Sequence, residues 1–173
     1  MPRRPESVQV FLVSEAEGKR VYLLLQRVAT PQLALPGFWQ GVTGALESGE
    51  SFEEAAVREV HEETNVLIEQ VFRTGFIHYF PIRPEWRSSY GQRPVQVEER
   101  VFYAFVPSGT LLLLSSEHQA FKWCSAEEAV ALLDFGQNRQ CLLAVERVLS
   151  SATLGHKGSM ERFTTSGRRS IVG

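Results

Sequence analysis

The stretch GALESGESFEEAAVREVHEETNV, residues 44–66, says more about the fold than any other part of this chain. Seven of its residues are glutamates, and Glu59, Glu62 and Glu63 crowd together just after Arg58. On a helix, residues three and four apart face each other, and like charges at that spacing cost about 0.2–0.5 kcal/mol per pair. The cluster therefore needs a positive charge that compensates for the repulsion.

Helix signals surround this cluster. Ser51 followed three residues later by Glu54 is the pattern of a capping box, in which each side chain accepts a hydrogen bond from the other residue's backbone. Apolar residues recur every four positions from Phe52 to Val60, on one face of a helix. Together these signals predict a helix from about Phe52 to Thr64.

A divalent cation is one partner that would stabilise the cluster. On the predicted helix, the carboxylates of Glu59, Glu62 and Glu63 can converge on one point. Mg²⁺ takes oxygen ligands, usually one or two carboxylates together with phosphate and water. Arg58 can orient a carboxylate through a bidentate pair, and Glu50 lies within its reach. The alternative is a solvated acidic helix face without a ligand.

The overall composition is that of an ordinary globular protein. The 173 residues are 43% hydrophobic and 22% charged, which suggests one domain with a sizeable core. A net charge of −2 gives no broad electrostatic footprint for nucleic acid or an anionic membrane. The start of the chain lacks a signal-peptide pattern, and Cys124 and Cys141 have no metal-type spacing. We expect a cytoplasmic protein with no membrane partner and no specific nucleic-acid partner.

The order of the other elements favours an α+β fold. Apolar runs at 7–14 and 20–28 predict a hairpin around the polar loop 15–19. The segment RPEWRSSYGQRP, residues 83–94, has the composition of a long exposed loop. The other expected elements are strands at 70–80 and 96–107, a short strand region at 111–124, and helices at 125–134 and 137–149. Strands, a helix, strands and then helices is an α+β order.

The last 23 residues differ in composition from the rest. They are rich in Ser, Thr and Gly, hold one glutamate against four Lys or Arg residues, and show no sustained apolar period. We interpret residues 1–150 as one folded domain and residues 151–173 as a flexible tail. Weak contact of the tail with an anionic partner is the alternative interpretation.

The spacing of the stretch resembles the Nudix box, the signature of the Nudix hydrolases. Gly44, five residues, Glu50, seven residues, Arg58-Glu59-Val60, one residue, Glu62-Glu63, one residue and Asn65-Val66 match it at every defined position but one. The family has glycine where this chain has Asn65, a mild departure because asparagine also tolerates a left-handed helix end. The resemblance implies the Nudix fold, a mixed sheet sandwiched between helices as an α/β/α sandwich.

The resemblance also implies a chemistry and roles for the box residues. Nudix enzymes hydrolyse a diphosphate linked to another group, with Mg²⁺ or Mn²⁺ bound to the box glutamates. The resemblance assigns Glu59 and Glu63 as the main metal ligands, with support from Glu62 and a backbone carbonyl near Gly44. Arg58 and Glu50 belong to the catalytic set as the pair that orients these carboxylates. The general base is either Glu62 or a carboxylate from elsewhere, for which Glu117 is the candidate.

Segments outside the box resemble a folate-pathway branch of the family, the bacterial dihydroneopterin triphosphate diphosphatases. These segments are FWQGVTGALESGE, VEERVFYAFVP, SEHQAFKW and NRQ, and together they span most of residues 8–149. In that branch the glutamate of the EH pair, here Glu117, is a further metal ligand. The Asn-Arg-Gln segment, here with Asn138 and Gln140, lies near the substrate.

Local chemistry is compatible with a flat ring that carries a triphosphate. Trp39, with Phe38 and Tyr79, can provide a flat surface, and Gln40, Asn138 and Gln140 can pair with the ring's edge. Arg27 can grip the phosphates. Core packing for the aromatic side chains and solvation for the arginines are the alternatives, and His118 is expected to be a hydrogen-bonded structural histidine.

Three functions therefore compete. The first is dihydroneopterin triphosphate diphosphatase activity, which releases pyrophosphate. A second is hydrolysis of nucleoside triphosphates or dinucleoside polyphosphates by the same chemistry. The third is a Nudix-fold binding module without catalysis, which the complete set of box carboxylates disfavours. A small phosphorylated molecule is the expected partner in the first two, and a homodimer is left open.

Overall fold

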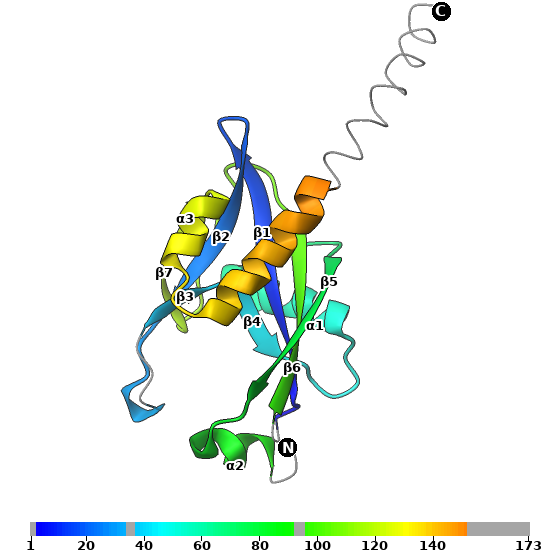
Figure 1. Cartoon of the computed structure of the whole chain (residues 1–173), viewed down its shortest axis with the longest axis vertical. Coiled ribbons are helices and arrows are strands. Elements are labelled where there is room, and N and C mark those ends of the chain that lie inside the picture. The colour runs from blue at the N-terminus through cyan, green and yellow to red at the C-terminus, as the bar shows by residue number, and fades with distance from the viewer. Residues whose placement is uncertain (1–2, 34–36, 92–95, 152–173) are drawn as a thin grey trace, which may run out of the picture.

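The computed structural model of the protein describes residues 3–33, 37–91 and 96–151. Within these residues, seven strands form one sheet with helices on both of its faces (Figure 1). The strands are β1 (Glu6–Ala16), β2 (Lys19–Arg27), β3 (Phe38–Gln40), β4 (Val42–Ala45), β5 (Phe72–Pro81), β6 (Gln96–Phe105) and β7 (His118–Cys124). The helices are α1 (Phe52–Thr64), the short α2 (Arg87–Tyr90), α3 (Ala126–Leu132) and the C-terminal helix (residues 136–151), with 3₁₀ turns at Pro31–Leu33 and Pro84–Trp86.

The sheet is mixed. Its order is β3-β2-β1-β6-β5, with β4 paired to β1 and β7 paired to β2. The long pairing of β1 with β6 is parallel, and the other pairings are antiparallel. The first half of β1 pairs with β4 and its second half with β2, so two antiparallel partners share the same edge of one strand. This arrangement places β4 beside β1 in the sheet, and helix α1 packs against both strands.

The sequence predicts the β1–β2 hairpin correctly but makes its loop too long. Ala16 pairs with Lys19, which leaves Glu17 and Gly18 as a two-residue turn. Both have positive φ, 54° and 75°, as a hairpin turn that follows the strand twist requires. Side-chain polarity at 15–19 concealed the fact that the backbone ladder continues to the turn.

The two sheet faces bury separate apolar cores, as expected for an α/β/α sandwich. One core packs α1 against alternate residues of β1 such as Val8, Val10 and Leu12. The other packs α3 and the C-terminal helix against Phe11 and Val13 on the opposite face. Apolar runs that are buried on both faces explain why β1 lacks the polar alternation of a half-buried strand.

Helix α1 has the bounds that the sequence predicts. Both hydrogen bonds of the Ser51–Glu54 capping box are present. At the other end, Asn65 adopts a left-handed conformation with φ 61°, and its N–H donates to His61 O at 2.8 Å. The substitution of asparagine for the family's glycine therefore preserves the helix ending.

Two sequence predictions need correction. The loop expected from residue 83 folds into the 3₁₀ turn and α2, because Tyr90 packs with Ile82 and Val97 in a small third core. The strand region expected from residue 111 begins only at His118. Before it, Leu113 N–H and Ser115 N–H donate to the carbonyls of Thr64 and Glu63, so this segment caps the end of α1 instead of joining the sheet.

Other expectations concern the ends of the chain and the membrane. The interpretation of residues 151–173 as a tail falls on 152–173, outside the described residues, while residue 151 still belongs to the C-terminal helix. In the part of the chain that the structure describes, no helix is long and apolar enough to cross a membrane.

Candidate active site

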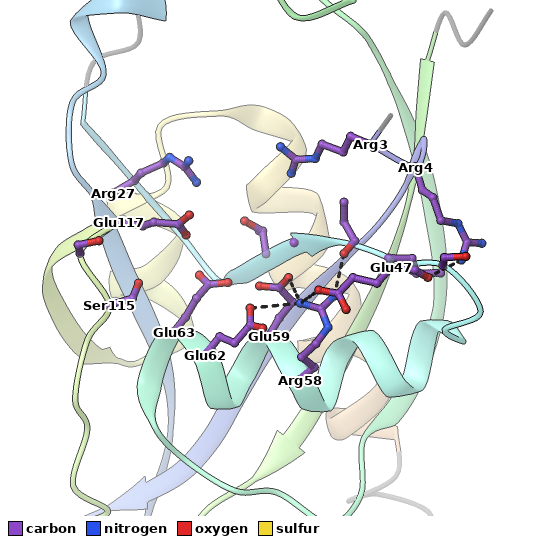
Figure 2. A pocket seen from close by; sticks show the side chains of 16 residues that line it. Arg3, Arg4, Arg27, Glu47, Arg58, Glu59, Glu62, Glu63, Ser115 and Glu117 are labelled. Carbon is purple, nitrogen blue, oxygen red and sulfur yellow. Dashed lines mark hydrogen bonds and ion pairs between the residues drawn. The ribbon is translucent and has the colours of Figure 1, made fainter. Parts of the chain in front are cut away.

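A cleft of about 940 Å³ lies between α1, β4 and the segment that precedes β7 (Figure 2). We call it the acidic cleft, because α1 contributes Glu59, Glu62 and Glu63 to it and Glu117 approaches from the other side. Gly44 of β4 lies in its wall, and Arg27 lies at its rim beside Glu117. The structure thus brings all the residues predicted as metal ligands into one cleft.

Arg58 organises the helix side of this cleft. Its Nε and Nη2 donate to the two carboxylate oxygens of Glu50 at 2.8 and 2.9 Å, which is a bidentate pair. Its Nη1 donates to Glu59 at 2.7 Å and to Glu62 at 3.2 Å, and its Nη2 also reaches the carbonyl of Ala45 at 2.9 Å. One guanidinium therefore fixes three carboxylates and ties α1 to the end of β4.

These contacts set the protonation states of the pair. The hydrogen bond from Arg58, ahead of the opposing effect of burial, holds the pKa of Glu50 below its usual value. The same hydrogen bond raises the pKa of Arg58. Both groups are therefore charged near neutral pH, as an orienting ion pair requires.

Gly44 is required by the position of Glu59. A Cβ built on Gly44 would lie 2.0 Å from the carboxyl carbon of Glu59. Any other residue would push this carboxylate out of the cleft, so the glycine serves close approach rather than backbone flexibility.

Glu63 is the most unusual carboxylate of the cleft. Its residue is 2% exposed, and neither of its side-chain oxygens has a hydrogen-bond partner among the described residues. Burial, followed by the neighbouring carboxylates of Glu59 and Glu117, raises its pKa. A buried acceptor without a donor is costly, so this arrangement needs a proton or a cation to complete it.

The residues that face Glu63 have the donor types of a hard-cation site. Ligand atoms of Glu63, Glu117 and His118 lie within 4.8 Å of one another. Burial, followed by the charge of Arg27, lowers the pKa of His118 to about 4, so its ring is neutral at pH 7. The 3.5 Å approach of His118 Nε2 to Glu63 is therefore not a salt bridge, and Gln40 lies on the same ring nitrogen at 3.4 Å. Glu117 itself is exposed to the cleft.

A second cavity of about 540 Å³ adjoins the acidic cleft, and we call it the aromatic cavity. Arg3, Arg27, Thr43 and Gly44 line both. Its aromatic lining residues are Phe38, Phe80, Trp86, Tyr90 and Phe135. Its polar lining includes the buried Gln40 and Glu99 and the half-buried His78. Flat aromatic walls and a polar floor suit a heteroaromatic ring.

Three of the five predicted substrate contacts line a cavity, and the other two do not. Arg27, Gln40 and Asn138 line the aromatic cavity, and Arg27 also lines the acidic cleft. Trp39 packs against the core under the C-terminal helix, and Gln140 is exposed, so the structure brings neither to these cavities.

Sequence reasoning missed Glu99 and His78 at this cavity. A signal was present in the sequence. Glu99 is two residues from both Val97 and Val101, so its carboxylate lies on the same, apolar face of the strand as these valines. His78 lies opposite it on β5 and contacts Glu99 Oε1 at 2.7 Å.

The geometry and the box spacing agree with comparisons to known proteins. The family model of the NUDIX domain matches residues 3–145. The chain belongs to the Nudix family, and its fold and its activity class, a hydrolase, follow from that membership. The family assignment made from the box is thereby confirmed.

Individual members of the family are similar to this chain over most of its length. A dihydroneopterin triphosphate diphosphatase of Escherichia coli K12 is 35% identical over 144 residues, which cover 81% of this chain and 91% of that protein. The structure of the E. coli dihydroneopterin triphosphate pyrophosphohydrolase matches with a TM-score of 0.67 and 30% identity, over 82% of this chain and 94% of that one. An asymmetrical bis(5'-nucleosyl)-tetraphosphatase of Caenorhabditis elegans is 31% identical over 120 residues, 69% of this chain and 78% of that protein.

Proposed function

We propose that this protein is a Mg²⁺-dependent diphosphatase that hydrolyses dihydroneopterin triphosphate to the monophosphate and pyrophosphate. The observation that carries the proposal is the shared wall of the two cavities, at Arg27, Thr43 and Gly44. A ring in the aromatic cavity would extend its phosphates past this wall into the acidic cleft. The likeness to the E. coli diphosphatase supports the same substrate. A cytoplasmic location and a place in folate synthesis are part of this proposal.

The residues of the acidic cleft fit a divalent cation. Glu63 offers two buried oxygens without donors, and Gly44 leaves the space that the Glu59 carboxylate fills. Glu59, Glu63 and Glu117 would hold the cation, with Glu62 and the Gly44 carbonyl in support. When bound, Mg²⁺ supplies neutralisation of the phosphate oxygens and Lewis acidity.

The reaction adds water across a phosphoanhydride bond. The water oxygen forms a new bond to phosphorus, the bond between the α and β phosphoryl groups breaks, and one water proton passes to a base. Arg27 and Arg3 line both cavities and would bind the phosphate oxygens by charge-assisted hydrogen bonds. Arg58 keeps Glu59 and Glu62 oriented throughout.

Two carboxylates are candidates for the base. Glu62 accepts a hydrogen bond from Arg58 at 3.2 Å, and half of its side chain is exposed. Glu117 is exposed to the cleft opposite Glu63, and its carboxylate accepts no hydrogen bond from the described residues. We expect the substitution of the true base by glutamine to abolish the acidic limb of the pH profile of kcat, while the other substitution preserves that limb.

A parallel turnover assay tests the substrate. Purified protein with Mg²⁺ is given dihydroneopterin triphosphate, the common nucleoside triphosphates or diadenosine tetraphosphate, with pyrophosphate and phosphate resolved. We expect kcat/KM for the pterin substrate to exceed the others by at least about tenfold, with pyrophosphate as product. Preference for another substrate would refute the pterin assignment and leave the diphosphatase chemistry. Activity on none of them would favour a binding module.

A further inference from the structure

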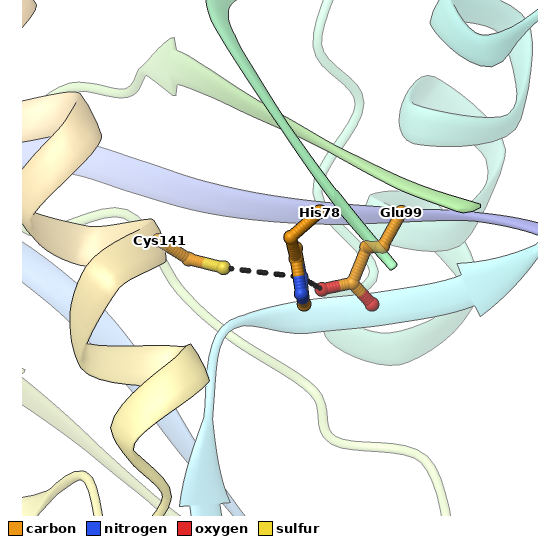
Figure 3. A group of neighbouring side chains, drawn as sticks. All are labelled: His78, Glu99 and Cys141. Atoms are coloured by element: carbon orange, nitrogen blue, oxygen red, sulfur yellow. Dashed lines mark hydrogen bonds and ion pairs between the residues drawn. The ribbon is translucent and has the colours of Figure 1, made fainter. Parts of the chain in front are cut away.

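The polar floor of the aromatic cavity, which His78, Glu99 and Asn138 line, belongs to a network of buried and half-buried polar side chains. Figure 3 shows three members of this network, His78, Glu99 and Cys141. His78 of β5 and Glu99 of β6 point toward each other, and Cys141 approaches His78 from the C-terminal helix at 3.4 Å. Gln9 of β1, which is fully buried, bonds to Glu99 at 3.0 Å. Buried polar groups in a cavity that would hold the ring can determine which ring binds, and this inference rests on the proposed function.

The backbone fixes the orientation of the network. Gly41 N–H donates to Gln9 Oε1 at 3.0 Å, so the oxygen of this amide must face Gly41. Gln9 Nε2 then faces the other way, and it donates to Glu99 Oε1 at 3.0 Å and to Asn138 Oδ1 at 3.2 Å. Both hydrogens of Gln9 Nε2 are used, so the atoms of Glu99 and Asn138 that face this nitrogen must be acceptors.

Glu99 presents one acceptor to the cavity. Its Oε1 accepts from both Gln9 and His78, and because a carboxylate only accepts, His78 Nε2 carries the proton of that bond. Its Oε2 accepts no hydrogen bond from the described residues and is not among the fully enclosed unpartnered atoms. Since the residue lines the aromatic cavity, Oε2 is the acceptor that a ligand can reach.

Asn138 presents a donor beside this acceptor. Its Oδ1 faces Gln9, so its Nδ2 carries the free hydrogens. Asn138 lines the same cavity, and it flanks the same Gln9 nitrogen as Glu99. The cavity floor therefore offers an acceptor and a donor side by side, in an order set by the Gly41 backbone.

We propose that Glu99 and Asn138 select a 2-amino-4-oxo pyrimidine ring edge, the edge that pterin and guanine share. The ring N–H and the 2-amino group donate to Glu99 Oε2, and the ring carbonyl accepts from Asn138 Nδ2. Adenine has a lone pair in place of this ring N–H and hydrogen in place of the 2-amino group, so it cannot place two adjacent donors on the carboxylate. Glu99 and Asn138 are thus specificity-determining residues, and Gln9 and His78 position them.

The test compares substrates across matched variants. Glu99→Gln replaces the carboxylate, and Glu98→Gln is its control, because Glu98 points to the opposite sheet face and pairs with Arg100. With Mg²⁺, we expect Glu99→Gln to lower kcat/KM for dihydroneopterin triphosphate and GTP by about 10- to 100-fold and for ATP by less than about threefold. Glu98→Gln should change none of them by more than about twofold. An equal loss on all three substrates, or no loss, would overturn the proposal.

A second variant covers the case in which Glu99→Gln unfolds the protein. Asn138→Asp keeps an oxygen for Gln9 and replaces the donor by an acceptor, at a half-buried position. It should reduce kcat/KM for GTP at least about tenfold more than for ATP. Equal effects on the two would again contradict the assignment.

Binding without turnover separates this inference from the proposed function. Calorimetry with GMP and AMP in the absence of metal should show a preference for GMP in the wild type that Asn138→Asp removes. If dihydroneopterin triphosphate is a poor substrate but this preference holds, the proposed function fails and the ring assignment stands. If that substrate is preferred but the variants do not change the preference between GMP and AMP, only the ring assignment fails. A zinc ion bound at a 1:1 ratio by His78, Glu99 and Cys141 would also overturn it, because it would occupy the Glu99 carboxylate.

Discussion

The acidic cleft takes most of its functional side chains from one continuous stretch, residues 44–63, whereas the polar floor of the aromatic cavity combines β1, β3, β5, β6 and the C-terminal helix. In the cleft, the helix period alone brings Glu59 and Glu63 together. In the cavity, Gln9, Glu99 and Asn138 meet only because β1 pairs with β6 and the C-terminal helix packs over both. A local site can be found from the spacing of residues, while a non-local site requires the pairing of strands.

The largest expected effect tests whether the cleft depends on its buried carboxylate. Glu63→Gln should lower kcat with Mg²⁺ by at least about 100-fold, because even loss of a residue that supports a metal ligand costs 10–100-fold. Glu53→Gln, on the same helix but paired with exposed Arg73, is the control and should stay near wild type. Turnover and circular dichroism of both variants are the measurements. Near-normal turnover of Glu63→Gln would break the assignment of the cleft as the metal site.

The next effect tests whether Arg58 acts through geometry or through charge. Arg58→Lys keeps the charge but loses the bidentate bond to Glu50 and the bond to Ala45. We expect about 10- to 100-fold weaker Mg²⁺ activation and about 1–3 kcal/mol lower stability. A Mg²⁺ titration of activity and a urea unfolding curve measure the two. Unchanged Mg²⁺ dependence would show that positive charge alone is sufficient.

A moderate effect follows from the raised pKa of Glu63. Without metal, the folded state holds a proton on Glu63 that the unfolded state releases above its usual pKa of about 4.3. The free energy of unfolding that this group contributes therefore falls as the pH rises from the pKa of the unfolded state toward the pKa of the folded state. Mg²⁺ replaces the proton, so the rise in Tm that Mg²⁺ causes should be larger at pH 8.5 than at pH 6.5. Glu63→Gln should remove this difference, and an equal Mg²⁺ effect at both pH values in the wild type would contradict the prediction.

The smallest effect concerns the position at which this chain departs from the family pattern. Asn65→Gly should change kcat by less than about twofold and stability by less than about 0.5 kcal/mol, because both residues tolerate the left-handed conformation. Asn65→Ala should cost about 1 kcal/mol, since alanine lacks the short polar side chain whose local hydrogen bonding lets asparagine tolerate that conformation. Thermal unfolding of the pair measures the difference. A large loss in Asn65→Gly would mean that the asparagine side chain has a role beyond ending the helix.

The success of the sequence predictions follows the same division. The bounds of α1 are predicted because the capping box and Asn65 act within a few residues. The family pattern likewise locates Glu59, Glu63 and Gly44. By contrast, no strand was predicted at Phe38–Gln40, so the side-chain faces of β3 could not be assigned from the sequence. Trp39 was therefore predicted as a contact together with Gln40, although only Phe38 and Gln40 line the wall and Trp39 packs against the core.

The same uncertainty of face affects the C-terminal helix and the segment before β7. Gln140 lies about 200° around the helix from Asn138 and so faces away from the cavity. Gln137, which precedes Asn138, lines the cavity with it. The apolar run 111–114 has strand composition, but Leu113 N–H and the following Ser115 N–H donate to the end of α1. In each case a tertiary partner, which the sequence does not display, decided the outcome.

The shared strand β4 has a consequence for where the substrate is cut. Thr43 and Gly44 line both the aromatic cavity and the acidic cleft. Under the proposed function, the position of β4 fixes the distance between the ring and the metal-binding carboxylates. That distance sets how many phosphate groups lie between the ring and the bond that is hydrolysed. Changes at the cavity floor would then exchange one ring for another without moving the scissile bond, while a shift in the register of β4 against β1 would change the products.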